Sequence, residues 1–389
     1  MNNSNDLLYV GVDDHQLDLF EGQYSVPNGM AYNSYVLLDD KTAVLDTVDR
    51  RFTAVWLDRV RAALGARSPD YLVVHHMEPD HSASILDFMT AFPSATVVAS
   101  AMAFNMMRQF FGTDFADRRL VVKDGDTLPL GSRTLSVIAA PMIHWPEVVF
   151  TFDPSTKTLF SADAFGKFGA LDADEDWACE ARRYYFGIVG KYGPQVQAAL
   201  AKIAPLGVRT VRPLHGPVLE GDALGRALSL YSTWSAYRPE TPGALLAYTS
   251  VYGHTKEAVA LLADALSAAG CPKVAVADLA RDDMAEALED AFRYPVLVLA
   301  STTYNAGVFP FMETFIRHLA AHAYRDRLVG IVENGSWAPM AAKTMRDLLA
   351  PCPNLSFAAT PVRIRGGLDD ASTAQLRALA AELAPATRF

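Results

Sequence analysis

The chain has little cysteine, and its cysteines are not paired. Its 389 residues include only Cys179, Cys271 and Cys352, and no two of them form a Cys-x-x-Cys motif. Disulfide frameworks, zinc ribbons and rubredoxin modules need closely spaced cysteines. The sequence therefore argues against these classes and predicts three isolated thiols in a reducing cytosol.

Positive charge and long apolar runs are scarce as well. Lysine and arginine number 34 against 44 acidic residues, which gives a net charge of −10 and a pI of about 5.4. With no basic stripe, this balance argues against nucleic-acid binding. The N-terminus shows no signal peptide pattern, and no apolar run approaches the ~20 residues that span a bilayer. We expect a cytoplasmic protein without a membrane segment.

The composition is that of a folded protein with two or three domains. Hydrophobic residues make up 51% of the chain and charged residues 20%, which is enough apolar material for a large core. The segment Arg-Pro-Glu-Thr-Pro-Gly at residues 238–243 cannot continue a helix and reads as a linker. We therefore predict a first domain over residues 1–240 and a second over residues 244–389.

In the first domain we expect short strands and several helices. Trp56, Val60 and Leu64 recur at helical spacing. A second helix is expected at residues 193–203, and the polar segment 171–183 is given no element. The expected strands are residues 32–38, 43–45, 71–74, 95–99, 135–138, 148–152, 158–160 and 210–211.

In the second domain strands and helices alternate regularly. The strands are continuous apolar runs, which is typical of a parallel sheet covered on both faces. The expected strands are residues 245–248, 274–277, 296–300, 328–332 and a short one at Phe357. The expected helices begin at Thr255, near Asp283, at Phe311, at Ala338 and at Ser372.

A dense group of potential metal ligands follows the strand at residues 71–74. His76, Glu78, Asp80 and His81 lie within six residues, on what we expect to be a loop. Alternation places His76 and Glu78 on one side of the chain, and the two residues beyond Pro79 can face a second ion. Three more candidates follow later strands, where a rigid sheet can aim them at a common centre. These are His144, Asp163 and His215.

This ordered set resembles the flavodiiron branch of the metallo-β-lactamase superfamily. Zinc hydrolases of the superfamily usually carry histidine where this chain has Glu78, and a carboxylate there suits iron better than zinc. The resemblance implies an N-terminal β-lactamase-like αββα sandwich that holds two non-haem irons. It assigns His76, Glu78 and His144 to one iron, assigns Asp80, His81 and His215 to the other, and makes Asp163 the bridge.

Three loops in the second domain predict a phosphate and flavin site. Each follows a strand end on one edge of the expected sheet, where doubly wound folds bind their ligands. The first loop lacks the Gly-Lys-Ser/Thr ending of a P-loop, and a helix capped by Ser and Thr is the alternative for it. The candidate residues are Thr249, Ser250, Val251, Tyr252, Gly253, His254 and Thr255; Ser301, Thr302, Thr303, Tyr304, Asn305 and Gly307; and Asn334, Gly335, Ser336 and Trp337.

The three loops together resemble a flavodoxin module, which would be a doubly wound α/β domain that binds FMN. His254 departs from the resemblance, because related loops often carry asparagine there. The segment Arg183–Tyr185 also resembles flavodiiron sequence, which makes Tyr184 or Tyr185 a candidate hydrogen-bond donor beside the irons. Among the remaining histidines, His15 is a candidate near the open side of the site.

The resemblance implies an oxidoreductase that reduces dioxygen to water, nitric oxide to nitrous oxide, or both. It also implies a head-to-tail homodimer or a dimer of such dimers. Because the chain ends at Phe389 without a rubredoxin or flavin-reductase extension, we expect an external electron donor, such as rubredoxin or a reductase fed by NAD(P)H or deazaflavin. Two alternatives stay open: a dizinc hydrolase with a regulatory flavodoxin domain, and a redox or gas sensor.

Overall fold

The structure is a computed structural model that describes residues 6–389. Residues 1–5, part of the segment in which we looked for a signal peptide, lie outside the described residues. The chain divides into two compact units, Met1–Ser232 and Thr233–Phe389. The proline-rich segment belongs to the second unit, because the backbone N–H groups of Glu240 and Thr241 both donate to the carbonyl of Arg293.

The first unit is built on two six-stranded sheets. The first sheet has the order β1 (Leu7–Tyr9), β6 (Tyr35–Leu37), β7 (Ala43–Leu45), β8 (Tyr71–Val73), β9 (Thr96–Ser100) and β10 (Arg119–Val122). The second has the order β11 (Thr127–Pro129), β12 (Thr134–Ala139), β13 (Val149–Asp153), β14 (Thr158–Phe160), β15 (Thr210–Arg212) and β16 (Leu219–Glu220). Two strand pairs, β2 (Val12–Asp14) with β5 (Met30–Tyr32) and β3 (Leu19–Phe20) with β4 (Tyr24–Ser25), lie beside them.

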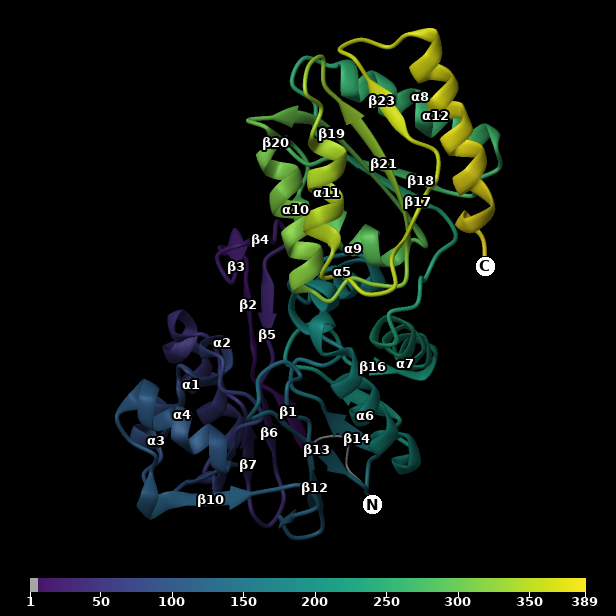
Figure 1. The fold of residues 1–389 in the computed structure, drawn as a ribbon. Helices are drawn as coiled ribbons and strands as arrows, with labels where there is room; N and C mark the ends of the chain where they lie inside the picture. Colours follow the sequence, from purple (N-terminus) through teal and green to yellow (C-terminus); the bar gives the residue numbers. More distant parts are fainter. Residues whose placement is uncertain (1–5) are drawn as a thin grey trace. The chain divides into compact units, whose positions relative to one another are not determined.

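The two sheets pack face to face through apolar side chains. Leu45, Val73 and Val98 of the first sheet share one core with Leu135 and Val149 of the second. Helices cover both outer faces, which gives the predicted αββα sandwich (Figure 1). The helices are α1 (Thr53–Leu64), α3 (Ile85–Ala91) and α4 (Ala101–Phe111) on one side, and α6 (Gly193–Ile203) and α7 (Gly221–Ser235) on the other.

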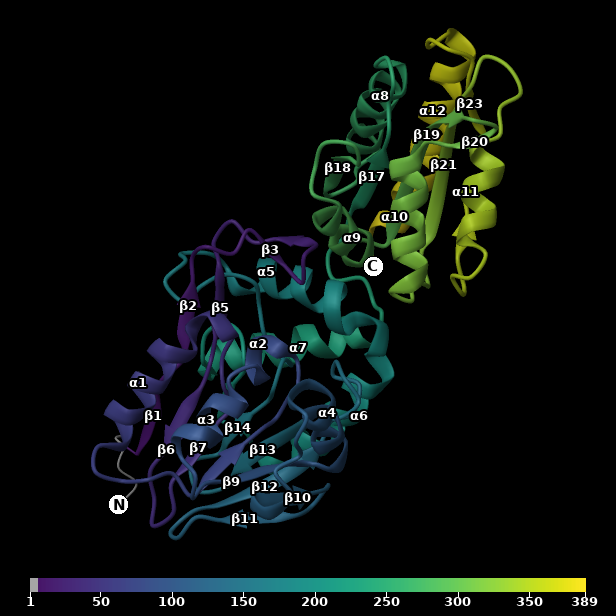
Figure 2. The same ribbon diagram turned by 90° about the vertical axis from the view of Figure 1, so that its left-hand side faces the viewer.

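The second unit is a doubly wound parallel sheet, as the apolar strands predicted. Its strands lie in the order β18 (Val274–Asp278), β17 (Ala244–Tyr248), β19 (Val296–Tyr304), β21 (Leu328–Asn334) and β22 (Ser356–Phe357). A short strand β23 (Val362–Ile364) also pairs with β21. Helices α8 (His254–Ala268) and α12 (Asp370–Leu383) pack on one face, and α9 (Met284–Arg293), α10 (Pro310–Ala321) and α11 (Ala341–Leu349) cover the other (Figures 1 and 2).

The structure corrects three local expectations. Helix α5 (Trp177–Tyr184) begins inside the polar segment that was given no element. The apolar pattern did not reveal this helix, because two of its buried residues are the arginines Arg182 and Arg183. Asp80 and His81 lie in the short helix α2 (Pro79–Ser82) rather than in a loop. Strand β19 continues through the expected second flavin loop to Tyr304, where it forms a hairpin with β20 (Gly307–Val308).

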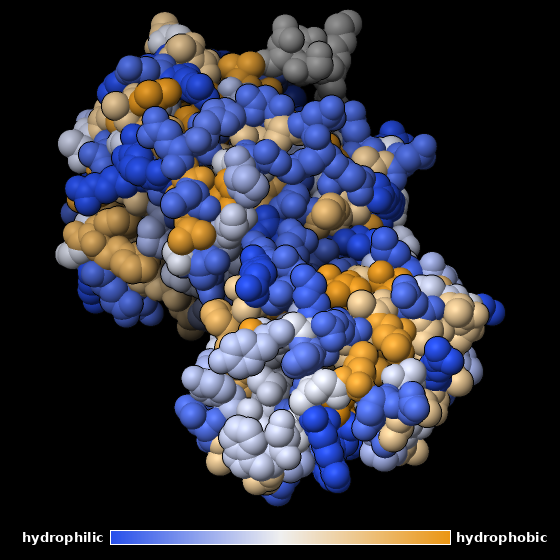
Figure 3. All heavy atoms as spheres, turned by 90° about the horizontal axis from the view of Figure 1, so that it is seen from above, coloured by the Kyte–Doolittle hydropathy of each residue, from blue (hydrophilic) through white to orange (hydrophobic). Residues whose placement is uncertain are grey.

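Within the described residues, no helix is long and apolar enough to cross a membrane. The face drawn in Figure 3 is largely hydrophilic, with smaller hydrophobic patches between the polar residues. This finding agrees with the absence of a long apolar run in the sequence.

Arg327 secures the start of the second unit. Its buried guanidinium donates to the carbonyls of Tyr237 at 2.8 Å, Tyr294 at 2.9 Å and Phe292 at 2.5 Å. We predict that Arg327→Leu lowers the free energy of unfolding of this unit by about 2–4 kcal/mol, because three carbonyls lose charged donors. Urea unfolding followed by circular dichroism measures the change. The exposed Arg317→Ala is the control, and an equal effect of both variants would contradict the prediction.

Candidate metal centre and flavin cavity

Seven side chains that can bind metal converge in the first unit. They form one group of His76, Glu78, His144 and Asp163, and a second group of Asp80, His81 and His215. In each group the candidate ligand atoms lie within 4.8 Å of one another. These are the seven residues proposed from the sequence, so the fold brings the whole set together.

Both sheets position these residues. His76 follows β8, whose last residue is Val73, and Glu78 precedes the proline that begins α2. The single turn of α2 places Asp80 and His81 behind that proline. His144, Asp163 and His215 come from the loops after β12, β14 and β15 of the second sheet. Loops of the two sheets thus meet at one place.

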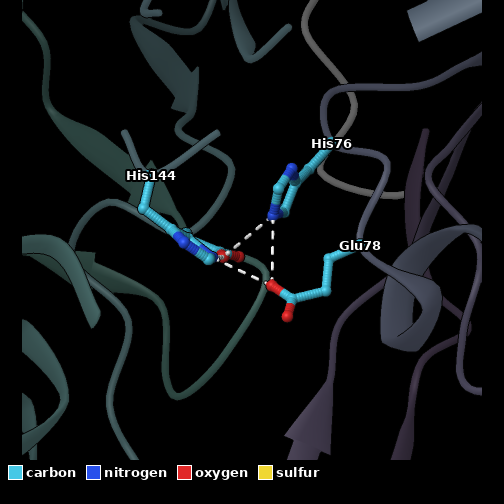
Figure 4. Close-up of side chains that lie close together, drawn as sticks. His76, Glu78 and His144 are labelled. Atoms are coloured by element: carbon cyan, nitrogen blue, oxygen red, sulfur yellow. Dashed lines mark hydrogen bonds and ion pairs between the residues drawn. The ribbon is translucent and has the colours of Figure 1, made fainter. Parts of the chain in front are cut away.

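Glu78 stands at the centre of the first group. Its Oε2 atom lies 2.9 Å from His144 Nε2 and 3.3 Å from His76 Nε2. Figure 4 shows the side chains of His76 and Glu78, which share the loop between β8 and α2, and of His144, from the loop after β12, pointing toward one another. Asp163 completes the group, with Oδ2 at 3.1 Å from His144 Nε2 and 3.4 Å from His76 Nε2.

Asp163 also faces the second group. Its other oxygen, Oδ1, lies 3.5 Å from His81 Nε2 and 3.8 Å from His215 Nε2. Asp80 Oδ2 lies 3.2 Å from each of the same two nitrogens. The two oxygens of Asp163 therefore face different groups, which is the geometry that a bridging carboxylate requires.

The two Nε2 atoms of His81 and His215 face each other at 2.9 Å. The Nδ1 atom of His215 lies 2.7 Å from the carbonyl of Ala31 and must donate to it, which leaves the Nε2 of a neutral His215 as a lone pair. In addition, the buried oxygens of Asp80 and Asp163 have no hydrogen-bond donor among the described residues. Anionic oxygens and imidazole lone pairs that converge without donors fit divalent cations.

The charges of the first group shift one another's pKa values. Burial alone would lower the pKa of His144, but the neighbouring carboxylates of Asp163 and Glu78 raise it to about 9. Burial would raise the pKa of Glu78, but the two histidines hold it well below its usual value. The metal-free group therefore holds its positive charge on imidazole and its negative charge on carboxylate.

Of the two tyrosine candidates, Tyr184 lies against the site. Its ring centroid is 5.5 Å from that of His215, and burial together with the charge of Asp163 raises its pKa well above the usual value. Tyr185 instead packs against Tyr231, with ring centroids 5.0 Å apart. His15 has an exposed side chain that lies 3.4 Å from Asp172 and belongs to neither ligand group, so its place at the open side of the site stays a prediction.

Two acidic residues beside the site escaped the sequence analysis. Glu147 is buried and pairs with His76 Nδ1 at 2.8 Å. Glu21, in the turn between β3 and β4, lies against Glu78 and His144, and partial desolvation and the charge of Glu78 raise its pKa to about 7. A single acidic residue in a loop usually marks the surface, so neither position carried a signal that the sequence alone could reveal.

The second unit contains a cavity of about 740 Å³ at the carboxyl edge of its sheet. This volume is in the range of small-molecule and cofactor sites, which is ~300–1,000 Å³. Of the seventeen residues proposed from the sequence, the thirteen that line the cavity are Ser250, Val251, Tyr252, His254, Thr255, Thr302, Thr303, Tyr304, Asn305, Asn334, Gly335, Ser336 and Trp337.

Four of the proposed residues do not line the cavity. Thr249 and Ser301 are buried and their hydroxyl groups bond to each other at 2.8 Å. Gly253 has a φ of +99° at the N-cap of α8 and so shapes the first loop, and Gly307 belongs to the β19–β20 hairpin. The cavity has four further lining residues outside the proposed set: Ala306 and Ala338, which lie in the second and third predicted loops, and Met340 and Gly366, which lie outside the predicted loops.

Gly366 belongs to a fourth wall of the cavity, formed by the segment after β23. The side chain of Asn334 fixes this wall, because its Nδ2 donates to the Gly366 carbonyl at 2.9 Å and its Oδ1 accepts from the Gly366 N–H at 3.0 Å. Among the residues that line the cavity, none is Asp, Glu, Lys or Arg, and His254 is the one histidine. The cavity is therefore aromatic and hydroxyl-lined, with almost no fixed charge.

Comparison with known proteins gives a family match in the first unit. Residues 30–216 match the profile of the ODP family beta lactamase, and this range contains the seven clustered residues. The putative diflavin flavoprotein A 2 of Synechocystis is 32% identical over 330 residues, or 83% of this chain and 56% of that protein. The chain thus spans little more than half the length of that relative.

Other relatives match along most of their length. The nitric oxide reductase of Moorella thermoacetica is 29% identical over 88% of both chains. Among solved structures, the rubredoxin oxygen:oxidoreductase of Desulfovibrio gigas superposes with a TM-score of 0.92 at 25% identity, over 100% of this chain and 98% of that one. The flavodiiron protein of Giardia intestinalis, at 24% identity and a TM-score of 0.91 over 98% and 95% of the chains, shares the fold.

The raised pKa of His144 predicts how the stability of the metal-free protein changes with pH. Histidine in an unfolded chain has a pKa near ~6.5, so the stability from protonated His144 is complete below about pH 6.5 and is lost as the pH rises through about 9. We expect a loss of about 1–3 kcal/mol across this window, measured by urea unfolding of chelated protein.

His144→Gln should reduce that slope without abolishing it, because the pKa values of His76 and His215 are raised as well, and parallel pH profiles for the two proteins would contradict the prediction. Metal affinity should change in the opposite direction. Because a metal needs the unprotonated imidazole, the affinity of the wild-type protein for divalent metal should rise with pH over the same window.

Proposed function

Since the chain is homologous to the flavodiiron protein family, we propose that it is an oxidoreductase that reduces dioxygen to water, nitric oxide to nitrous oxide, or both. It would do so at a non-haem diiron site, with electrons passed through FMN from an external donor. The observation that carries this proposal is the pair of adjacent ligand groups that share Asp163.

The ligand set supports iron. Each group offers carboxylate oxygens beside imidazoles, and Glu78 lies between His76 and His144 where a third histidine would favour zinc. The alternative, a dizinc hydrolase with a regulatory flavodoxin domain, is distinguished by metal analysis and a visible spectrum. Two irons with bound FMN support the oxidoreductase, and two zincs support the hydrolase.

The protein's own contribution at this centre is orientation and exclusion of water. Two irons held there would supply electrons in pairs to a bound diatomic molecule, and the flavin would supply two more. Asp163 would hold the two positions at a fixed separation, because its oxygens face different groups. Tyr184, buried against His215, places a hydroxyl group beside the carboxylates.

FMN would occupy the cavity of the second unit. The N–H groups at the start of α8 and the hydroxyl of Thr255 suit a phosphate, since the helix dipole favours negative charge there. Tyr304 and Trp337 offer flat surfaces for the isoalloxazine. A lining without acidic or basic side chains is consistent with a flavodoxin type of site.

The flavin cavity and the ligand groups belong to different units of the chain. Electron transfer between the two sites of one chain would then have to cross from one unit to the other. For this reason we propose a head-to-tail homodimer, or a dimer of such dimers, in which each flavin passes electrons to the irons of the partner. The donor would be a rubredoxin or a reductase fed by NAD(P)H or deazaflavin, and the location would be cytoplasmic.

We predict that the reduced, iron-loaded protein is reoxidised by at least one of the two gases. Stopped-flow absorption of the flavin and the irons, with dioxygen and nitric oxide in parallel and one artificial donor, measures both rates. Asp163→Asn should abolish turnover, because it weakens the carboxylate that faces both groups. The absence of oxidation by either gas would contradict the proposed function.

We predict that His254→Ala weakens FMN binding about tenfold while riboflavin binding changes less than about twofold. The reason is that His254 is the one lining side chain that can bring a positive charge to the phosphate, and a hydrogen bond to a charged group is worth about 1.5–3 kcal/mol. Quenching of flavin fluorescence measures both affinities. Equal weakening of the two ligands would show a role other than phosphate binding.

A further inference from the structure

Glu147 connects the loops that carry two of the candidate ligands. It lies three residues after His144, in the loop between β12 and β13, and its side chain is fully buried. One carboxylate oxygen, Oε1, lies 2.8 Å from His76 Nδ1 and accepts a hydrogen bond from the Met77 N–H at 2.8 Å. The backbone carbonyl of Glu147 accepts from Ser100 Oγ at 2.9 Å, so β9 holds this residue in place.

This contact determines which nitrogen of His76 is free to bind a metal. Oε1 already accepts from Met77, so it acts as an acceptor and the proton of the neutral imidazole lies on Nδ1. The lone pair then lies on Nε2, which is the atom that faces Glu78 and Asp163. A carboxylate behind a ligating histidine also makes its metal-binding nitrogen more basic.

The histidines of the second group have weaker support. The Nδ1 of His215 donates to a neutral carbonyl, that of Ala31, and the buried Nδ1 of His81 has no hydrogen-bond partner among the described residues. Of these three histidines, His76 is thus the one whose Nδ1 pairs with a carboxylate. The two groups are not equivalent, although each contains two histidines.

The neighbouring His75 shows that such a pairing does not by itself make a ligand. Asp46 accepts from the His75 backbone N–H at 2.7 Å and pairs with its Nδ1. However, the Nε2 of His75 lies 2.8 Å from Thr151 Oγ1 and belongs to neither ligand group. Asp46 therefore supplies a matched control, because it is a buried carboxylate bonded to a buried histidine away from the metal positions.

We propose that Glu147 is a positioning residue that makes the group of His76, Glu78 and His144 the tighter of the two metal positions. The inference rests on the proposed diiron centre and adds an order of affinity to it. Because a carboxylate partner of this kind is worth about 10–100-fold in metal affinity, losing its charge should weaken one position selectively.

The test uses the full chain, freed of metal by chelation and titrated anaerobically with cobalt(II), whose visible absorption reports binding. His215→Ala removes a ligand of the second group, so that only the metal position of His76 stays complete. His144→Ala removes a ligand of the first group, so that only the metal position of Asp80 and His81 stays complete. We expect Glu147→Gln to weaken cobalt binding 10–100-fold in the first background and by less than about threefold in the second. Asp46→Asn should leave both cobalt affinities within about threefold, although it should lower the free energy of unfolding because it changes a buried hydrogen-bonded carboxylate.

Equal weakening in both backgrounds, or none, would overturn the assignment of Glu147. If Glu147→Gln does not give the circular dichroism of the folded protein, Glu147→Asp keeps the charge on a shorter side chain. Glu147→Asp should then weaken cobalt binding only in the His215→Ala background, and by a smaller factor than is expected for Glu147→Gln. If the wild-type chain binds no pair of cobalt ions, the proposed metal centre itself fails, and the inference fails with it.

Discussion

The constraint on which the first unit depends is the burial of two carboxylates, Asp80 and Asp163, without hydrogen-bond donors. An uncompensated buried charge costs several kcal/mol, so this arrangement persists only if cations or protonated imidazoles face it. Without metal, the histidines meet this need, which is why the pKa of His144 reaches about 9. Metal ions would neutralise the two carboxylates without protonated imidazoles. The same cluster also connects loops of both sheets of the sandwich.

The cluster of candidate ligands could be predicted from the sequence, but the residues that hydrogen-bond to those candidates could not. His76, Glu78, Asp80 and His81 are dense enough along the chain to stand out, and the other three follow strands that the apolar pattern revealed. Glu147 is a single acidic residue in a loop, and its role exists only because Met77 and His76 meet it across the sandwich. The choice of Tyr184 over Tyr185 likewise depended on the direction of one helix, which no local pattern encodes.

In the second unit the parallel sheet could be predicted from continuous apolar strands, whereas the ends of those strands could not. Ser301 and Thr302 read as a loop because they are polar, yet their backbones continue the ladder opposite Glu333 and Asn334. The hydroxyl of Ser301 is used by Thr249 behind the cavity rather than by a ligand. The wall at Gly366 was missed because a short strand and a backbone amide bound by Asn334 leave no motif in the sequence.

The two sites solve opposite electrostatic problems, and this explains why they need different surroundings. The first gathers buried negative charge and must attract cations, so each imidazole needs a partner that turns its lone pair inward, as Glu147 does for His76. To bind FMN as proposed, the second would have to hold a dianionic phosphate within a chain of net charge −10, yet none of its lining residues is lysine or arginine. The attraction would then come from N–H groups at the start of α8, whose favourable field extends only about one helical turn. A side chain that can carry charge therefore matters most at the first residue of that helix, and there the chain has His254.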